Sequence, residues 1–332
     1  MISQVLALAV IGCGPKPPPS SPVVGTPDPP PASPVLDPAG AAAGVEHPGL
    51  AGLLIRHWDH RMRRSPVWAT RLGDRRFDET LGDASWEAAE QDLATTRGFL
   101  AEARALQSDP ALGEADALTL EIFVLGLQQT VDEAVCRFHA WSLSPRFNAL
   151  VDVYDLPEAH SVRSAEDAWT LLARYRAAPA RIAAEAARLS RGSEQGYVAP
   201  AETIRRTLSQ ADDALGRPVA ASPLLAPLEW ETPGLDPAQR RDWEDALRVA
   251  VEEDIRPALV AWRDRLRSSV LPAGRAPEAA GLRFLPDGEA CYAALVRRYT
   301  TLARTPDQVH QAGLDAIAAV HQEFSQLGPG TV

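Results

Sequence analysis

Residues 281–327 read GLRFLPDGEACYAALVRRYTTLARTPDQVHQAGLDAIAAVHQEFSQL, and this stretch holds the sharpest helix signals in the chain. Thr305 fits an N-cap, Pro306 falls at the first helical position, where no N–H is needed, and Gln308 completes a capping box. Apolar residues then recur at three- and four-residue steps, which places them on one helical face: Val309, Ala312, Ala316, Ile317, Val320, Phe324 and Leu327. The stretch therefore predicts a long amphipathic helix over 306–327.

A second amphipathic helix is predicted immediately before this one. Its apolar side carries Tyr292, Leu295, Val296, Tyr299 and Leu302. Consecutive amphipathic helices need other elements to bury their apolar faces. The tail 328–332, Gly-Pro-Gly-Thr-Val, is too short to cover them. We therefore expect these two faces to require a further packing partner.

Helical periodicity also dominates the chain upstream of this stretch. A first helix is expected from His47-Pro48 to Pro66, others follow Ser85, Ala111, Ser164 and Pro200, and the longest starts at Asp236-Pro237. That longest helix has a buried stripe and a bend at Pro257: Trp243, Leu247, Val251, Ile255, Leu259, Trp262 and Leu266. Residues 141–157 break the periodicity and are expected to form a structured loop, and 283–285 a short extended piece. No segment alternates like a strand, so the predicted fold class is all-α, a multi-helix array.

Composition limits the partners that the chain can have. The net charge of −11 argues against nucleic acid, because phosphate binding needs basic patches. Lys16 is the only lysine, so 33 basic residues minus 1 leaves 32 arginines. A GC-rich genome is the favoured explanation of this bias, and an arginine-based anion site is the alternative.

The start of the chain resembles the signal of a bacterial lipoprotein. The apolar run 5–12 is too short to span a bilayer, and it ends in Val10-Ile11-Gly12-Cys13, which resembles a lipobox with Cys13 as the lipidated thiol. Met1 to Gln4 lacks the basic residue that usually precedes such a run. We expect a signal peptide over 1–13, a proline-rich tether over 14–46, a helical domain over 47–327 and a tail over 328–332. The implied location is the cell envelope, with the protein anchored to a bacterial membrane through its lipid.

The cysteine count allows one internal disulfide. If Cys13 is lipidated, Cys136 and Cys291 could pair. Both fall among apolar residues of predicted helices, where cysteine behaves as a small hydrophobe, so two buried free thiols are the favoured expectation.

Catalytic motifs are absent from the sequence. No histidine is followed by glutamate, so the HExxH zinc helix is missing, and G-x-S-x-G, a P-loop and GxGxxG are missing too. His57 and His60 lie three residues apart, but no third ligand is spaced to join them in a metal site. The expectation for this chain is therefore no catalytic residue and no metal ligand.

Three segments, in order, resemble one family of bacterial proteins, the domain-of-unknown-function 885 family. Pro66 to Asp78 resembles the family's opening, and Arg191 to Pro200 resembles its glycine turn before a helix. The third segment carries the largest set of matching residues: Gly281, Gly288, Tyr292, Thr300, Thr301, Thr305, Pro306, His310, Gly313 and Leu314. Cys291 departs from the pattern, since the family usually has a second aromatic residue beside Tyr292. The resemblance covers roughly residues 48–327.

This resemblance implies a function that the chain alone does not carry. Family members resemble zinc-dependent peptidases of the helical, neurolysin-like zincin kind, and their zinc-binding helix lies in a second half beyond the matched part. The chain then looks like the N-terminal half of a truncated peptidase lipoprotein, inactive alone and without cofactor, whose complete form uses zinc and a peptide substrate. Gly73, Asp74, Tyr292 and His310 are the residues that the resemblance places at one wall of the cleft. The alternative is a non-catalytic helical lipoprotein that binds peptides or envelope components.

Overall fold

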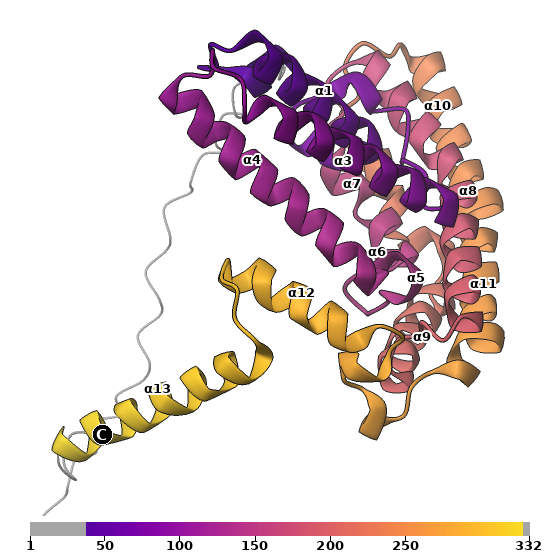
Figure 1. Ribbon diagram of the computed structural model, residues 1–332. Helices are drawn as coiled ribbons and strands as arrows, with labels where there is room; N and C mark the ends of the chain where they lie inside the picture. The colour runs from indigo at the N-terminus through magenta and orange to yellow at the C-terminus, as the bar shows by residue number, and fades with distance from the viewer. Residues whose placement is uncertain (1–37, 328–332) are drawn as a thin grey trace, which may run out of the picture. The chain divides into compact units, whose positions relative to one another are not determined.

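The structure, a computed structural model, describes residues 38–327. Within this range the regular structure is helical and contains no strand, which confirms the all-α prediction; two isolated bridges pair Ser144 with Phe147 and Pro200 with Arg275. The main helices are α1 (Pro48–Arg64), α2 (Pro66–Arg71), α3 (Trp86–Leu106), α4 (Glu114–Glu133), α8 (Ala165–Glu194), α9 (Ala201–Gly216), α10 (Pro237–Val249), α11 (Arg256–Arg265), α12 (Gly288–Thr300) and α13 (Pro306–Leu327). Figure 1 labels most of them along the chain.

Local sequence signals explain where these helices begin. The side chains of Ser85, Ser164 and Asp236 each accept a hydrogen bond from a first-turn N–H. Thr305 and Gln308 form the predicted reciprocal capping box, with Thr305 N–H to Gln308 Oε1 at 2.9 Å and Gln308 N–H to Thr305 Oγ1 at 3.2 Å. The predicted helix starts at these four residues are therefore confirmed.

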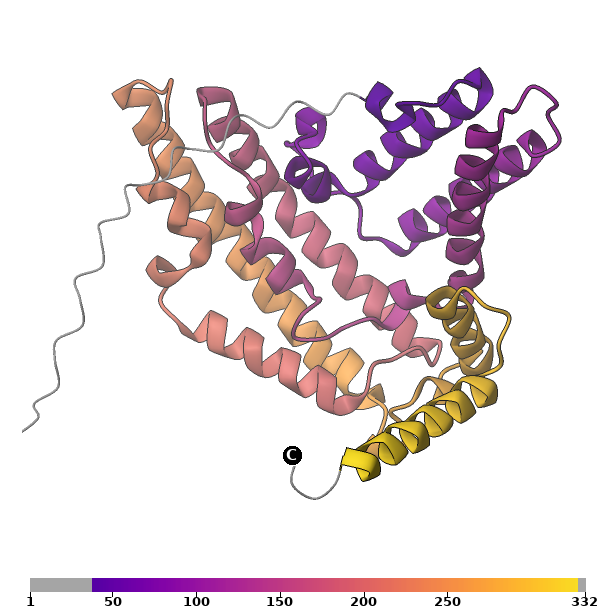
Figure 2. The ribbon, with the colours of Figure 1, turned by 90° about the vertical axis from the view of Figure 1, so that its left-hand side faces the viewer.

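The largest hydrophobic core surrounds α8. The helices α10 and α11 run beside it, as Figure 2 shows, and α9 packs against α11. The predicted stripe from Trp243 to Leu266 is entirely buried in this core, beside Leu171, Tyr175 and Ile182 of α8. A second core joins α1, α3 and α4 through Leu50, Phe99, Leu120 and their neighbours.

Proline changes the hydrogen bonding of the long helix at the expected place. Pro257 has no N–H to donate, and the turn before it, Ala250–Ile255, is a π-helix in which the Arg256 N–H donates to Val251 O, five residues back. A second π-helical turn, Leu266–Val270, precedes Pro272. Each π-turn therefore lies directly upstream of a proline.

Two expectations need correction. Residues 141–157, expected to form a loop, contain parts of three short helices, α5 (Phe138–Trp141), α6 (Ala149–Tyr154) and α7 (Leu156–Ala159). These turns were missed because helices of four to six residues are too short to show periodicity. Leu282–Phe284 is a 3₁₀ turn, not an extended piece. Upstream of α1, Pro38–Ala42 forms a 3₁₀ helix that contacts α1, and Val45 packs on the second core.

The two cysteines of the described residues form a disulfide. The sulfur atoms of Cys136 and Cys291 lie 2.15 Å apart, so the expectation of two free thiols is wrong. The bond ties α12 to the 3₁₀ turn Ala134–Cys136 at the end of α4. Two ion pairs accompany it, Arg298 to Glu133 at 2.8 Å and Arg297 to Asp132 at 4.0 Å. Helical periodicity reports which face a cysteine occupies but not which other cysteine faces it, and the pairing was missed for that reason.

Several large apolar side chains of the last helices are exposed. They are Tyr292 and Tyr299 on α12, and Leu314, Ile317, Val320 and Phe324 on α13. The outer side of α4 adds Leu118, Ile122 and Leu125. Val296 of the predicted α12 face is buried, because α12 packs against α4. That a further partner covers the exposed residues of α12 and α13 stays a prediction.

Candidate functional site

Three arginines follow one side of the long helix α8. Arg174, Arg181 and Arg188 are spaced seven residues apart, which is close to two helical turns and places them on the same side. Arg174 and Arg181 hydrogen-bond to segments that connect the N-terminal helices, whereas Arg188 forms an ion pair with Glu185 of α8 itself. The row is the polar element around which we build the candidate site.

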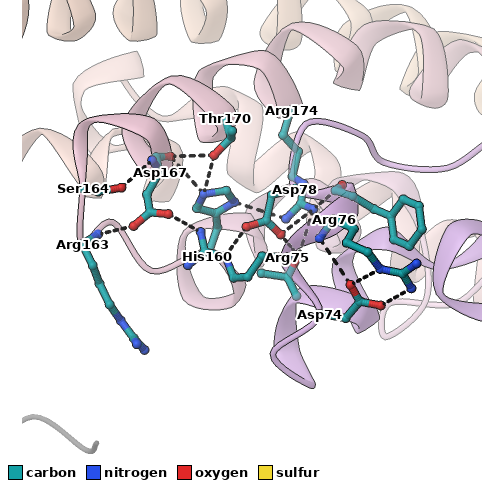
Figure 3. A network of polar contacts seen from close by, with 12 residues as sticks. Asp74, Arg75, Arg76, Asp78, His160, Arg163, Ser164, Asp167, Thr170 and Arg174 are labelled. Carbon is teal, nitrogen blue, oxygen red and sulfur yellow. Dashed lines mark hydrogen bonds and ion pairs between the residues drawn. The ribbon is translucent and has the colours of Figure 1, made fainter. Parts of the chain in front are cut away.

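Arg174 holds the loop after α2 against α8. Its guanidinium is completely buried and donates to Thr80 O at 2.9 Å, Thr70 Oγ1 at 2.9 Å and Phe77 O at 3.0 Å. Asp78 supplies its counter-charge at 3.5 Å, and the two residues point toward each other in Figure 3. Burial lowers the pKa of Arg174 to about 10, with Asp78 opposing the change. The group therefore remains charged at neutral pH.

His160 extends this network and has a defined tautomer. Arginine can only donate, so the contact of 3.3 Å from Arg174 Nη1 makes His160 Nδ1 the acceptor. The Nε2–H then donates to the carbonyl oxygen of Asp167 at 3.0 Å. Burial lowers the pKa of His160 to about 4, which the nearby Asp78 carboxylate only partly opposes. This histidine is neutral at physiological pH.

Gly73 and Asp74 form the turn that leads into the network. Gly73 has a φ of +91°, a conformation that residues with a side chain rarely adopt. Asp74 is fully buried, and it accepts from Arg76 Nε at 2.9 Å and Nη2 at 2.7 Å (Figure 3). Its carboxylate is thus engaged in holding this turn.

The four residues expected at a cleft do not meet in one site. Gly73 and Asp74 lie at the edge of the network, whereas Tyr292 lies half-exposed on α12 and His310 lies exposed on α13. Both residues lie inside helices, and within residues 38–327 neither side chain forms a hydrogen bond or a ring contact. The cleft-lining role of the four residues stays a prediction.

The network can fix a structure but offers no accessible reactive group. Asp74, Asp78, His160 and Arg174 are all buried and all have partners. General acid–base catalysis needs a titrating group within reach of a substrate, and this cluster has none. Sequence reasoning missed Arg174 and His160; the seven-residue arginine spacing was a signal, hidden by the many other arginines.

Zinc does not fit the residues that the structure describes. Over 38–327 no three His, Cys, Asp or Glu side chains gather where they could hold a metal ion. The imidazole of His57 packs edge-on against Phe99 and Phe123, while His60 bonds to Asp92 at 2.7 Å. Cys13, the expected lipidation site, lies outside the described residues. In the same part of the chain, no helix has the length and apolar character needed to cross a bilayer.

Comparison with known proteins connects the chain to one family and one fold. Residues 66–330 match a family described as bacterial protein of unknown function (DUF885). The fold is similar to the crystal structure of a protein described as the putative lipoprotein from Colwellia psychrerythraea, with a TM-score of 0.69 and 16% sequence identity. The match covers 82% of this chain and 49% of that chain, so this chain spans about half the length of the solved one. Among curated proteins, nothing matches.

Proposed function

Since the chain belongs to the bacterial family of unknown function DUF885, we propose that it is the N-terminal helical portion of a zinc-dependent, peptidase-like envelope lipoprotein. The helical, neurolysin-like architecture and the peptide substrate belong to this proposal. The metal site lies in a second portion that this chain does not contain. No step of hydrolysis is assigned to the described residues, because they do not gather the ligands that zinc needs.

The uncovered apolar faces of α12 and α13 are the observation that carries the proposal. A soluble monomer rarely exposes a contiguous patch of large apolar side chains unless something binds there. The solved chain of similar fold is about twice as long as the part that matches, so its length leaves room for a second portion. We infer that this second portion packs on α12 and α13.

Envelope location is supported by two independent features. The sequence around Cys13 resembles a lipobox, and the solved protein of similar fold is described as a putative lipoprotein. The Cys136–Cys291 disulfide adds a chemical argument, because structural disulfides persist in oxidising compartments and are rare in the cytosol.

A non-catalytic helical lipoprotein that binds peptides or envelope components is the second candidate. This candidate needs no metal site, and over residues 38–327 no three His, Cys, Asp or Glu side chains gather where they could hold an ion. This candidate requires no catalytic portion, so the two proposals differ in what the DNA after the Val332 codon encodes.

The deciding experiment expresses the chain alone and together with any helical portion encoded downstream. Bound zinc and hydrolysis of a fluorogenic peptide are measured in both preparations. We expect zinc and chelator-sensitive hydrolysis only when both portions are present. If neither bound zinc nor hydrolysis is found when both portions are present, the peptidase proposal is wrong. Tightly bound zinc and peptide hydrolysis by the single chain would mean that a second portion is unnecessary.

A further inference from the structure

A pocket of about 440 Å³ lies where the α1–α2 junction, α3 and α6 meet the arginine row of α8. It is lined by basic and acidic side chains together, including Arg64, Asp92, Asp152, Asp155, Arg181 and Arg188. The pocket is separate from the buried network of Arg174, which lies about two helical turns before Arg181 on the same helix. Its polar groups can be divided into those with partners and those without.

Arg181 and two of the aspartates already have partners. Arg181 donates to Asp152 Oδ2 at 2.9 Å and to Leu81 O at 3.2 Å. These bonds hold Asp152 and Leu81, two residues that line the pocket, against α8. Asp92 accepts from His60, at 2.7 Å between Oδ1 and Nε2. These groups build the pocket and have little capacity left for a ligand.

Arg188 is different, because its guanidinium donates no hydrogen bond to any residue between 38 and 327. Its side chain is only 17% exposed, and its one ion pair, with Glu185, is long at 3.8 Å. The Nε atom of Arg188 is buried and has no hydrogen-bond partner. The Nε atom of Arg64 also lacks a hydrogen bond, but it lies 3.9 Å from Asp92 Oδ2, with which it forms an ion pair. Leaving a buried donor of a charged group without an acceptor is costly. The guanidinium of Arg188, which donates no hydrogen bond, therefore indicates that an acceptor is missing.

Arg188 has a counter-charge, but that group gives it no hydrogen bond. Burial lowers the pKa of Arg188 most strongly, and Glu185 opposes this as the next largest influence; Arg181 and Arg64 lower the pKa further, and Asp152 raises it. Oxygen Oε1 of Glu185 accepts from Ala149 N at 2.9 Å and from Trp262 Nε1 at 3.2 Å, which holds the carboxylate in place. Its other oxygen, Oε2, lies 3.8 Å from Arg188 Nη2, too far for a hydrogen bond. Glu185 therefore supplies a counter-charge to Arg188 but no hydrogen-bond acceptor.

We propose that this pocket is a binding site for a small carboxylate, held by the guanidinium of Arg188. The planar guanidinium fork matches a carboxylate through two parallel hydrogen bonds. Asp152 and Asp155 on the same pocket wall would repel a polyanion, so a singly charged group fits better than a phosphate chain. The ligand is a free small acid or the C-terminal carboxylate of a peptide.

Binding to the chain of residues 1–332, measured by isothermal titration calorimetry, tests this proposal without requiring a peptidase. The probes are acetate, the dipeptide Ala-Ala, its C-terminal amide and inorganic phosphate. We expect saturable binding of acetate, Ala-Ala or both, and little binding of the amide. Binding of both indicates that the carboxylate alone is recognised; binding of Ala-Ala alone indicates a peptide terminus. Absence of carboxylate binding, or equal binding of the amide, overturns the proposal.

Variants assign the effect to Arg188. Arg188→Met should weaken binding about tenfold or more, the loss typical of a charge-assisted hydrogen bond. Arg176→Met is the matched control, because Arg176 is exposed on the same helix and should leave binding unchanged. Circular dichroism establishes folding, and if Arg188→Met does not fold, Arg188→Lys keeps the charge without the planar fork and should still weaken binding. Unchanged affinity in a folded Arg188 variant contradicts the assignment.

Discussion

At the scale of single residues, His160 makes the stability of the fold depend on pH. Its pKa is lowered from 6.5 to about 4, so the unfolded chain binds a proton between these values that the folded chain does not. The resulting stability is present above pH 6.5 and is lost as the pH falls toward 4. At about 1.36 kcal/mol per pKa unit, the loss is on the order of 3 kcal/mol.

Replacing His160 by a residue that cannot titrate should flatten this dependence. We expect the free energy of unfolding of His160→Gln, measured by urea denaturation from pH 7.5 to pH 4, to fall less steeply than that of the wild type. Some slope remains, because burial lowers the pKa of His57 to about 4 as well. His321→Gln, at an exposed position of α13, should retain the wild-type slope. Identical slopes for His160→Gln and the wild type would refute this role.

At the scale of secondary-structure elements, the disulfide holds α12 on α4. The docked side of α12 is small, with Gly288, Cys291, Ala294 and Val296 as its buried residues. A disulfide typically contributes about 2–4 kcal/mol to stability. The attachment of α12 therefore depends strongly on the Cys136–Cys291 bond.

Reduction should release α12 without melting the α8 core. We expect hydrogen exchange in 288–300 to accelerate in the presence of a reductant, while exchange in α8 changes little. A Cys136→Ser, Cys291→Ser double variant should show the faster exchange already, and the reductant should have no further effect on it. Two free thiols in protein purified from the envelope would show that the bond does not form in the native protein.

The elements also show how far sequence reasoning reaches. Caps at Ser85, Ser164, Asp236 and Thr305 and the stripe from Trp243 to Leu266 are local signals, and the helices follow them. The Cys136–Cys291 pair and the contact between Arg174 and the loop around Thr80 join residues 155 and 94 positions apart. No periodic pattern encodes such a contact. The fold class was therefore predictable, whereas the polar network and the pocket of Arg188 required the structure.

At the scale of the whole molecule, the exposed faces of α12 and α13 should control association. If a second portion normally covers them, the chain alone should bury them by self-association, since apolar area gains about 25 cal/mol per Å² when removed from water. We expect light scattering coupled to size exclusion to show oligomers that shift toward monomer in an Ile317→Glu, Phe324→Glu variant, in which both charges fall on the exposed apolar face. Gln322→Glu, Gln326→Glu adds the same charge to the polar face of α13 and should leave the oligomers intact. A wild-type chain that stays monomeric at high concentration would show that these faces need no partner, and the proposed second portion would lose its main support.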